Sequence, residues 1–425
     1  MKNIQRGMIA TALVVSFSLF ASGQRPFKVV KVPGSSPNSL TAINNSSEVV
    51  VNTPSASGSA ISLWSRTAGS QDLGLSNTGS SGADVNNFNY VTGAGDPNQS
   101  GNSQAFIWRP SSGVQWLGSL GGGLSAASAI NDSGAAVGLS YTSSFYQHAF
   151  LWTASGGMQD LTPAITRVGG AAATGINSLN QVVGYYFPNG ATNTLGFSWT
   201  QSGGLVNIGA TGTQAFAVND AGTVVGQSPN AKGFQHAFSW TQAGGLKDLG
   251  TLGGNSSTAL AINNKGWIVG TSLAAGTGSL HGFLWTPTGG MQDFTTLAGL
   301  AAGQQPFSLQ VNDYGVIALS TNKRVLLFIP VITGAFSSSA NPSKVGQPVT
   351  FTANLTSLAG APPDGETVQF SVGGKLAGTG TLSNGVAQFT TSTMTAGSHA
   401  IVVKYLGDTN YLSARFEALT QVVNP

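Results

Sequence analysis

The chain lacks cysteine and is poor in charge. None of its 425 residues is cysteine, and only 7% are Asp, Glu, Lys or Arg. The absence of cysteine excludes disulfide bridges, thiol catalysis, cysteine-ligated zinc and a lipidated N-terminal cysteine. Its 14 acidic residues and 4 histidines leave little material for acid–base chemistry. A hydrophobic fraction of 41% is enough for large cores, and it excludes disorder caused by high charge and low apolarity.

The N-terminal segment has the pattern of an export signal. Lys2 and Arg6 precede an apolar run over 8–21, and small residues then place a cleavage site before Gln24. The run is shorter than the roughly 20 residues of a transmembrane helix. We therefore predict a signal peptide over 1–23, with an N-terminal membrane anchor as the alternative, and no later membrane-spanning segment. Without the signal, 15 basic residues face 14 acidic ones, a balance that indicates no nucleic-acid partner.

The middle of the chain is an internal repeat. The pattern Ala-Ile-Asn-x-x-Gly-x-Val-Val-Gly recurs at intervals of 42, 45, 46, 42, 44 and 49 residues. Its seven asparagines are Asn44, Asn86, Asn131, Asn177, Asn219, Asn263 and Asn312. A second marker is a tryptophan, usually with a phenylalanine two positions earlier, as in Phe150 and Trp152. This spacing places both rings on one face of a strand, which favours packing between repeats over stacking on a carbohydrate.

Each repeat reads as four short strands, the size of a β-propeller blade. In the seventh repeat the third strand ends at Pro330, and no segment with the pattern of a fourth strand follows it. An additional strand over 27–32 precedes the first repeat. The sequence therefore predicts an all-β, seven-bladed propeller over 24–332, with a ring closed by the N-terminal strand. An open β-solenoid of the same repeats is the alternative.

The best copies of the repeat resemble the bacterial extracellular HAF repeat, named for His-Ala-Phe. They are His148–Thr153, His236–Thr241 and Gly245–Gly254. The resemblance covers about residues 27–329, although Ser62-Leu63-Trp64 and Val325-Leu326-Leu327 lack the His-Ala-Phe. It implies a secreted or surface location and carries no established biochemical activity.

The C-terminal region has a different pattern. Short alternating strands such as 349–353 and 400–405 replace the long repeat, which predicts a β-sandwich over 336–425. The segments Asn341-Pro342-Ser343, 346–353 and 405–411 resemble bacterial Ig-like repeat domains of surface proteins. That resemblance implies a spacer or an adhesive stalk.

Candidate chemistry is sparse. Most acids before the C-terminal region share repeat positions, whereas a catalytic site needs unlike groups that converge once. Three acids lie off the repeat positions, Glu48, Asp84 and Asp96. None of them stands in a pattern typical of a catalytic pair, so we predict no catalytic residue.

Three histidines share one repeat position, His148, His236 and His281. Histidines from separate blades could meet at a ring axis and bind zinc or copper. The same position holds Gln104 and Leu195 in other repeats, which favours a structural role. We therefore predict no metal site and no cofactor.

Aromatic residues outside the repeat pattern are the candidate binding site. They lie in the loops between the second and third strands of repeats three and four. The predicted binding residues are Tyr141, Tyr146, Tyr185, Tyr186 and Phe187, beside Phe145. Loops on a rigid scaffold often carry binding, so these rings are expected to form one patch for an extracellular glycan or protein. Ordinary loop packing is the alternative interpretation.

The sequence favours an exported, non-enzymatic binding or adhesion protein. The propeller face would be the recognition surface, and the Ig-like domain a spacer or adhesive module. A secreted hydrolase or lyase that acts on polysaccharide is one alternative, and a structural component of an extracellular layer is another. Fold alone does not decide among them.

Overall fold

The structure is a computed structural model that describes residues 25–425, except 56–57, 76–78, 99–100, 166–169, 277 and 302. The predicted signal peptide over 1–23 lies outside the described residues. The described part is all-β apart from the short helix α1 (Phe294–Ala298). No helix in that part has both the length and the hydropathy needed to cross a membrane.

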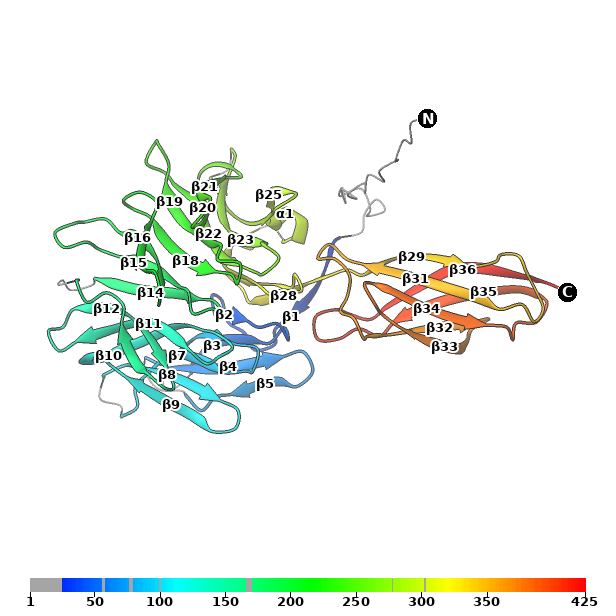
Figure 1. Ribbon diagram of the computed structural model, residues 1–425, viewed down its shortest axis with the longest axis horizontal. Coiled ribbons are helices and arrows are strands. Elements are labelled where there is room, and N and C mark those ends of the chain that lie inside the picture. Colours follow the sequence, from blue (N-terminus) through cyan, green and yellow to red (C-terminus); the bar gives the residue numbers. More distant parts are fainter. Residues whose placement is uncertain are drawn as a thin grey trace, which may run out of the picture.

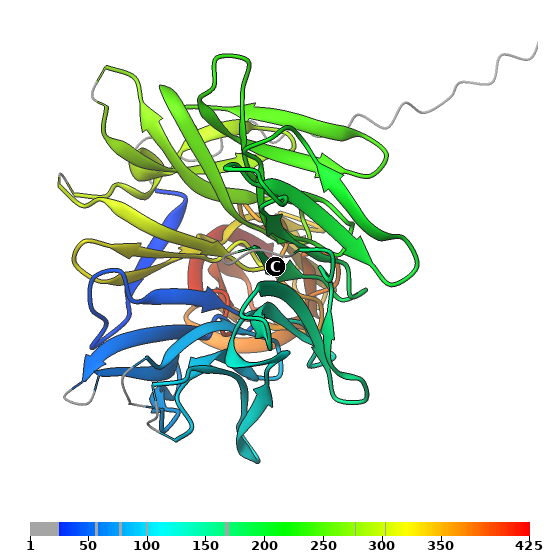
Figure 2. The same cartoon turned by 90° about the vertical axis from the view of Figure 1, so that its left-hand side faces the viewer.

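The first 28 strands form four-stranded sheets around a common axis, in a propeller-like arrangement (Figures 1 and 2). In sequence order, the sheets hold β2 (Leu40–Ile43), β3 (Val49–Ser55), β4 (Gly58–Ser65) and β5 (Gly69–Asp72); β6 (Ser81–Val85), β7 (Val91–Gly95), β8 (Gln104–Arg109) and β9 (Gly113–Gly118); β10 (Gly121–Ile130), β11 (Ala136–Thr142), β12 (Gln147–Thr153) and β13 (Gly157–Asp160); and β14 (Ala171–Ile176), β15 (Val182–Tyr186), β16 (Leu195–Thr200) and β17 (Gly204–Ile208). The later sheets hold β18 (Gln214–Val218), β19 (Val224–Pro229), β20 (Gln235–Thr241) and β21 (Gly245–Gly250); β22 (Gly253–Ile262), β23 (Ile268–Ala274), β24 (Leu280–Thr286) and β25 (Gly290–Asp293); and β26 (Pro306–Val311), β27 (Ile317–Thr321), β28 (Val325–Pro330) and β1 (Phe27–Lys31). Every neighbouring pair within these sheets is antiparallel, as expected for strands joined by short turns.

The last of these sheets joins the two ends of the repeat region. β1 pairs antiparallel with β28, with Phe27 opposite Pro330 and Lys31 opposite Leu326. Phe27 is buried, and its ring packs edge-on against Phe294 and Phe328 at centroid distances of 5.6 and 6.5 Å. The predicted pairing of the N-terminal strand with the third strand of the last repeat is therefore confirmed.

A β-bulge in the innermost strand explains the glycine of Val-Val-Gly. In the β18–β21 sheet, the register shifts between Ala215 and Ala217, and Gly226 lies opposite Ala215. A Cβ on Gly226 would overlap the carbonyl oxygen of Gln214. The same close approach of a glycine to the neighbouring strand occurs at Gly93, Gly138, Gly184 and Gly270. The glycine thus allows the bulge and the pairing to coexist.

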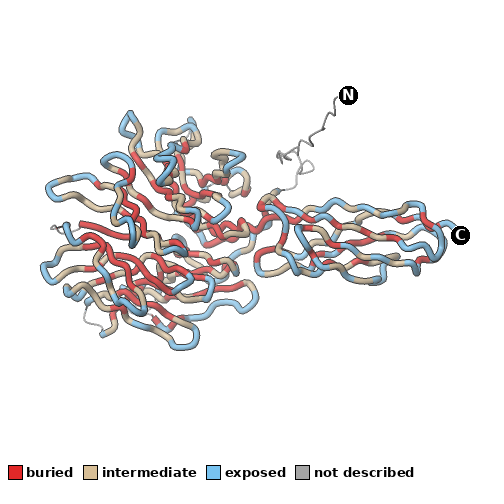
Figure 3. Tube along the Cα trace, viewed as in Figure 1, coloured by how far each residue is buried: buried red, intermediate tan, exposed pale blue. Residues whose placement is uncertain are grey.

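The predicted Phe and Trp pairs lie mainly in the cores between sheets. The five phenylalanines are at most 1% exposed: Phe106, Phe150, Phe197, Phe238 and Phe283. Phe106 and Trp108 pack with Val50 and Ile61 of the preceding sheet, and the other faces of the strands pack onto the following one. Figure 3 shows that the buried stretches of the trace lie inside the repeat region and the exposed stretches mainly at its turns and loops. Trp285 is only partly buried, so the packing interpretation holds less fully for the sixth repeat.

The C-terminal strands form a sandwich of a three-stranded and a five-stranded sheet. The first sheet holds β29 (Thr333–Ser338), β31 (Val349–Thr356) and β34 (Val386–Thr391). The second holds β30 (Ser343–Lys344), β36 (Ala414–Asn424), β35 (Gly397–Tyr405), β32 (Thr367–Val372) and β33 (Lys375–Thr381). Their inner faces share one core that includes Phe351, Phe370 and Tyr405. The predicted sandwich is present.

Candidate functional site

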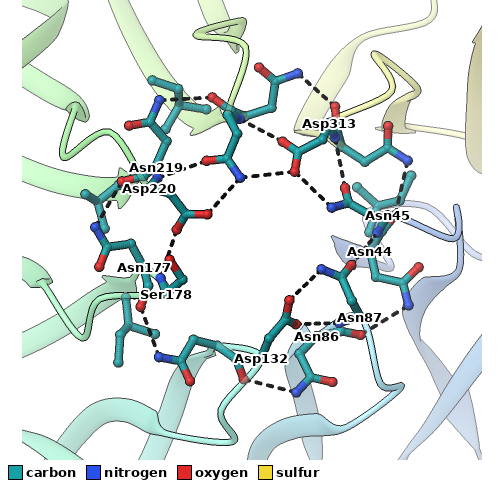
Figure 4. Close-up of a pocket in the computed structure, with 18 of the residues that line it drawn as sticks. Asn44, Asn45, Asn86, Asn87, Asp132, Asn177, Ser178, Asn219, Asp220 and Asp313 are labelled. Atoms are coloured by element: carbon teal, nitrogen blue, oxygen red, sulfur yellow. Dashed lines mark hydrogen bonds between the residues drawn. The ribbon is translucent and has the colours of Figure 1, made fainter. Parts of the chain in front are cut away.

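A ring of asparagines surrounds the axis where the innermost strands end (Figure 4). The Nδ2 of each repeat asparagine donates to the backbone oxygen of the next one, and Asn312 donates back to Asn44. The donor–acceptor distances around this asparagine ring lie between 2.8 and 3.2 Å. The repeat pattern located these residues, but their joining of neighbouring sheets could not be predicted from it.

Each ring asparagine also shapes its own turn. The Oδ1 of Asn131, for example, accepts from the backbone N–H groups of Ser133 and Ala135 at 3.1 and 3.0 Å. This is the local side-chain-to-backbone bonding that the Asn-x-x-Gly pattern predicts. One residue therefore forms the turn through its oxygen and links adjacent sheets through its nitrogen, which explains a buried asparagine in every copy.

The innermost strands enclose a channel along the axis of the ring. At the mouth of the channel that carries the asparagine ring, the residues that follow the ring asparagines line a polar cavity of about 220 Å³. They are Asn45, Asn87, Asp132, Ser178, Asp220, Asn264 and Asp313. The Nδ2 of Asn264 donates to Asp220 and Asp313 at 3.0 and 3.1 Å, and Asn87 donates to Asp132 at 2.8 Å. The carboxylates accept hydrogen bonds from side-chain amides of neighbouring repeats. These polar residues therefore form a hydrogen-bonded band that has a structural role.

The C-terminal sandwich docks beside this mouth. The Oδ1 of Asn410 accepts from Ser47 at 2.6 Å and from Asn312 at 3.0 Å, and its Nδ2 donates to the Asn45 carbonyl at 2.8 Å. The hydroxyl of Tyr411 donates to the backbone oxygen of Tyr314 at 3.3 Å. Asn410 is buried, so the contact is part of the folded structure and fixes the sandwich to the first and last repeats.

A second band of the channel lies toward the opposite mouth. Residues at the β-bulges line a cavity of about 220 Å³ there, among them Thr41, Ser128, Thr174, Phe216 and Leu260. Unlike the asparagine ring, these side chains differ from repeat to repeat. An apolar ring of Ile and Val separates the two cavities. The bulged band therefore departs from the repeat symmetry more than the asparagine ring does.

Asp84 is the ionisable side chain among the described residues that line this band. Burial raises its pKa to about 6, and the nearby Asp132 adds to the rise. Backbone N–H groups of Val85 and Ile130, at 2.8 and 3.0 Å, oppose the rise without cancelling it. The sequence had marked Asp84 as an off-pattern acid, but not its place in the channel.

We expect Asp84→Asn to remove a pH-dependent part of the stability. A carboxyl group with a raised pKa in the folded state stabilises the fold below its unfolded pKa, and this contribution is lost as pH rises through the folded pKa. The wild type should lose up to about 3 kcal/mol between about pH 4 and about pH 7 relative to the variant. Urea unfolding of both proteins at the two pH values measures the difference. Parallel pH profiles of the two proteins would contradict the assignment.

The candidate histidines pair within their own sheets. His148, His236 and His281 place Nδ1 at 2.7, 2.8 and 3.0 Å from the carboxylates of Asp160, Asp248 and Asp293, respectively. Burial alone would raise the pKa of Asp293, but hydrogen bonds from Thr296 and His281 outweigh it and hold the pKa below its usual value.

The separate pairs give the histidines a structural role. No group of three possible metal ligands occurs among the residues that the structure describes. The sequence contained a signal for these pairs. Repeats with Gln104 or Leu195 in place of His carry Trp116 or Asn207 in place of Asp.

The predicted aromatic residues belong to two adjacent sheets, and three of them lie in strands instead of the predicted loops, Tyr141 in β11 and Tyr185 and Tyr186 in β15. The Tyr141 hydroxyl lies 3.4 Å from Gln147 Oε1, and Gln147 Nε2 donates to the carbonyl of Ala171 at 3.1 Å. Ala171 is in register with Tyr186, so Gln147 links the two hairpins. The hydroxyl of Tyr186 donates to Asn207 at 3.0 Å. These bonds hold Tyr141 and Tyr186 within the scaffold.

The other aromatic residues differ in exposure. Phe145, at the tip of the β11–β12 loop, is 64% exposed with φ of 59°. Tyr146 and Tyr185 are half-buried, and the backbone N–H of Phe187 donates to Gly170 at 2.6 Å. Phe145 is not one of the five predicted binding residues, yet it is the most exposed aromatic ring of this group.

Comparison with known proteins identifies the C-terminal domain. Residues 336–424 match the bacterial Ig-like domain (group 3) family. This match confirms the Ig-like resemblance, whereas the resemblance of 27–329 to the HAF repeat stays a prediction. No curated protein matches the chain.

Among solved structures, a streptogramin B lyase is 12% identical with a TM-score of 0.45, covering 71% of this chain and 97% of that chain. The virginiamycin B lyase from Staphylococcus aureus is 10% identical with a TM-score of 0.45, covering 72% of this chain and 99% of that chain. This similarity assigns no activity to the chain.

Proposed function

We propose that the protein is an exported, non-enzymatic binding protein with a recognition face on a seven-bladed propeller. The propeller spans 24–332, and β1 closes its ring. The Ig-like domain over 336–425 holds the propeller away from its point of attachment. The closed cycle of asparagine bonds and the pairing of β1 with β28 support the ring.

The position of the Ig-like domain carries the proposal. The domain docks on the face with the asparagine turns, which join the first and second strands. Because neighbouring strands are antiparallel, the loops between the second and third strands lie at the opposite end of each sheet. The loops β11–β12 and β15–β16 therefore point away from the sandwich, as Figures 1 and 2 show. Aromatic residues on the face of the propeller away from the sandwich are placed to meet a partner.

The channel supports binding more than hydrolysis. Glycoside hydrolysis needs two carboxyl groups that flank one bond. Asp84 is the ionisable side chain among the described residues that line its band, and its acidic neighbour Asp132 lies in the other band, where it accepts from Asn87 at 2.8 Å. The carboxylates at the other mouth accept hydrogen bonds from amides that fix the turns. The partner we propose is an extracellular glycan or protein that contacts the aromatic loops.

A capture experiment with the chain over 24–425 tests this proposal. A glycan array and an extracellular protein extract are screened, and each ligand found is then measured against Tyr141→Ala/Tyr146→Ala/Tyr185→Ala/Tyr186→Ala. Removal of the aromatic anchors should weaken binding by about tenfold or more. Tyr146 lies in the β11–β12 loop, whereas Tyr141, Tyr185 and Tyr186 are half-buried at the ends of β11 and β15, so a moderate fall in melting temperature is expected and the melting curve must show that the variant is folded.

The control variant is Phe88→Ala/Leu179→Ala. These two side chains are 61% and 76% exposed and lie in the asparagine turns, on the face that carries the Ig-like domain. We expect this variant to bind as the wild type does. If the aromatic variant captures the ligand as well as the wild type does, or if the control variant loses as much binding as the aromatic variant, the face away from the sandwich is not the recognition surface.

A further inference from the structure

A cationic groove lies where the N-terminal strand closes the last sheet. It has a volume of about 340 Å³ and lies between the β1–β28 pair and the segment that follows α1. The pairing of β1 with β28 brings two basic segments together, 25–31 and 323–324, which are nearly 300 positions apart in the chain. This groove belongs neither to the channel nor to the aromatic loops.

Four basic residues line the groove, Arg25, Lys31, Lys323 and Arg324, and no acidic residue does. All four are exposed, and none of them takes part in the ion pairs of the described residues. Like charges gathered without counter-charges repel one another. In a chain with a formal net charge of only +3, this group is a local excess that an anion would neutralise.

The end of the groove beside α1 is built by Arg25. Its guanidinium donates to the carbonyl oxygens of Ala298 and Gly299 at 3.1 and 3.0 Å. Gly299 has φ of 59°, and a Cβ there would overlap the guanidinium. The arginine is thus held against the C-terminal end of the helix, and a positive charge stays at this end of the groove.

Apart from Gln304, the side chains in the rest of the lining are apolar. Val29, Leu300 and Leu326 line the groove, and Val29 is 46% exposed although it lies in a strand. Apolar surface beside fixed cationic groups is typical of sites for small ligands, in which a few polar groups set the orientation. The combination fits a ligand that has an anionic group and an apolar body.

We propose that this groove binds a small organic carboxylate with an apolar body. The carboxylate lies among Lys31, Lys323 and Arg324, and the hydrocarbon lies on Val29, Leu300 and Leu326. Charge-assisted hydrogen bonds from lysine and arginine suit a carboxylate, and burial of the hydrocarbon adds affinity. The groove is too small for a polymer footprint, and its phenylalanine, Phe328, is buried and offers no face to a nucleic-acid base.

Calorimetric titration of the chain over 24–425 tests the proposal with octanoate as the probe, below its micelle-forming concentration. Octanoate should bind at one site, acetate should bind about tenfold or more weakly, and octylammonium should not bind. Lys31→Gln/Lys323→Gln should weaken octanoate binding by about tenfold or more. Lys232→Gln, an exposed lysine in the β19–β20 loop, is the matched control and should leave binding unchanged.

Each other result overturns the proposal. If acetate and octanoate bind equally well, the groove is a simple anion site and its apolar lining does not contribute to binding. Binding of octylammonium, or octanoate binding that the double variant does not alter, would place the ligand elsewhere. Binding of single-stranded DNA but not octanoate would replace the small carboxylate by a polyanion. Melting curves of both variants show that they are folded, and the aromatic-loop variant should bind octanoate normally whatever the fate of the proposed recognition face.

Discussion

Phe27→Ala is expected to lower the free energy of unfolding by about 3–5 kcal/mol. The side chain is 3% exposed and packs against Phe294 and Phe328. Its loss would leave a cavity at the point where β1 and β28 join the ends of the repeat region. Chemical denaturation measures the change, and the melting temperature should fall with it.

Val29→Ala is the matched control in the same strand. Val29 is 46% exposed, so its truncation should cost less than about 1 kcal/mol. A deletion of residues 24–32 should destabilise the protein more than Phe27→Ala, because it also removes the hydrogen bonds between β1 and β28. An unchanged unfolding transition in the deletion would show that β1 does not close the ring.

Gly226→Ala is expected to destabilise the protein by about 3 kcal/mol. The added methyl group would overlap the carbonyl oxygen of Gln214, which belongs to the paired backbone and cannot rotate away. The strands must then separate or the bulge must shift, and either change breaks ladder hydrogen bonds. Denaturant midpoints of the purified variant give the size of the effect.

Gly233→Ala separates this overlap from the general cost of replacing glycine. Gly233 has φ of 83°, and a Cβ there meets no atom within 4 Å. Its substitution should cost about 1 kcal/mol, the strain of a left-handed alanine. Equal losses in the two variants would mean that the close approach at Gly226 has no structural importance.

Sequence spacing predicted the strands well because the period is a local property. A bulge glycine, an Asx turn and a Phe-x-Trp strand each depend on neighbours within a few positions, so every copy repeats them. The buried Phe106 and the pairing of β1 with β28 were accessible by this reasoning. The missing fourth strand of the last repeat was as informative as the strands that are present.

Contacts between repeats were harder to predict. The bond from Asn131 Nδ2 to the backbone of Asn177 depends on the angle between two sheets, which the period does not give. The pairing of His148 with Asp160 was within reach, because histidine and aspartate occur or are absent together in most repeats. The groove at Lys31 and Lys323 was not, since its two basic segments meet only after the ring closes.

The docking of Asn410 has a mechanical consequence. Its side chain bonds both to Ser47 in the first repeat and to Asn312 in the last. A pull on the sandwich is therefore shared by both sides of the seam between these repeats instead of peeling one of them outward. The second domain therefore tethers the first and last repeats to each other as well as to itself.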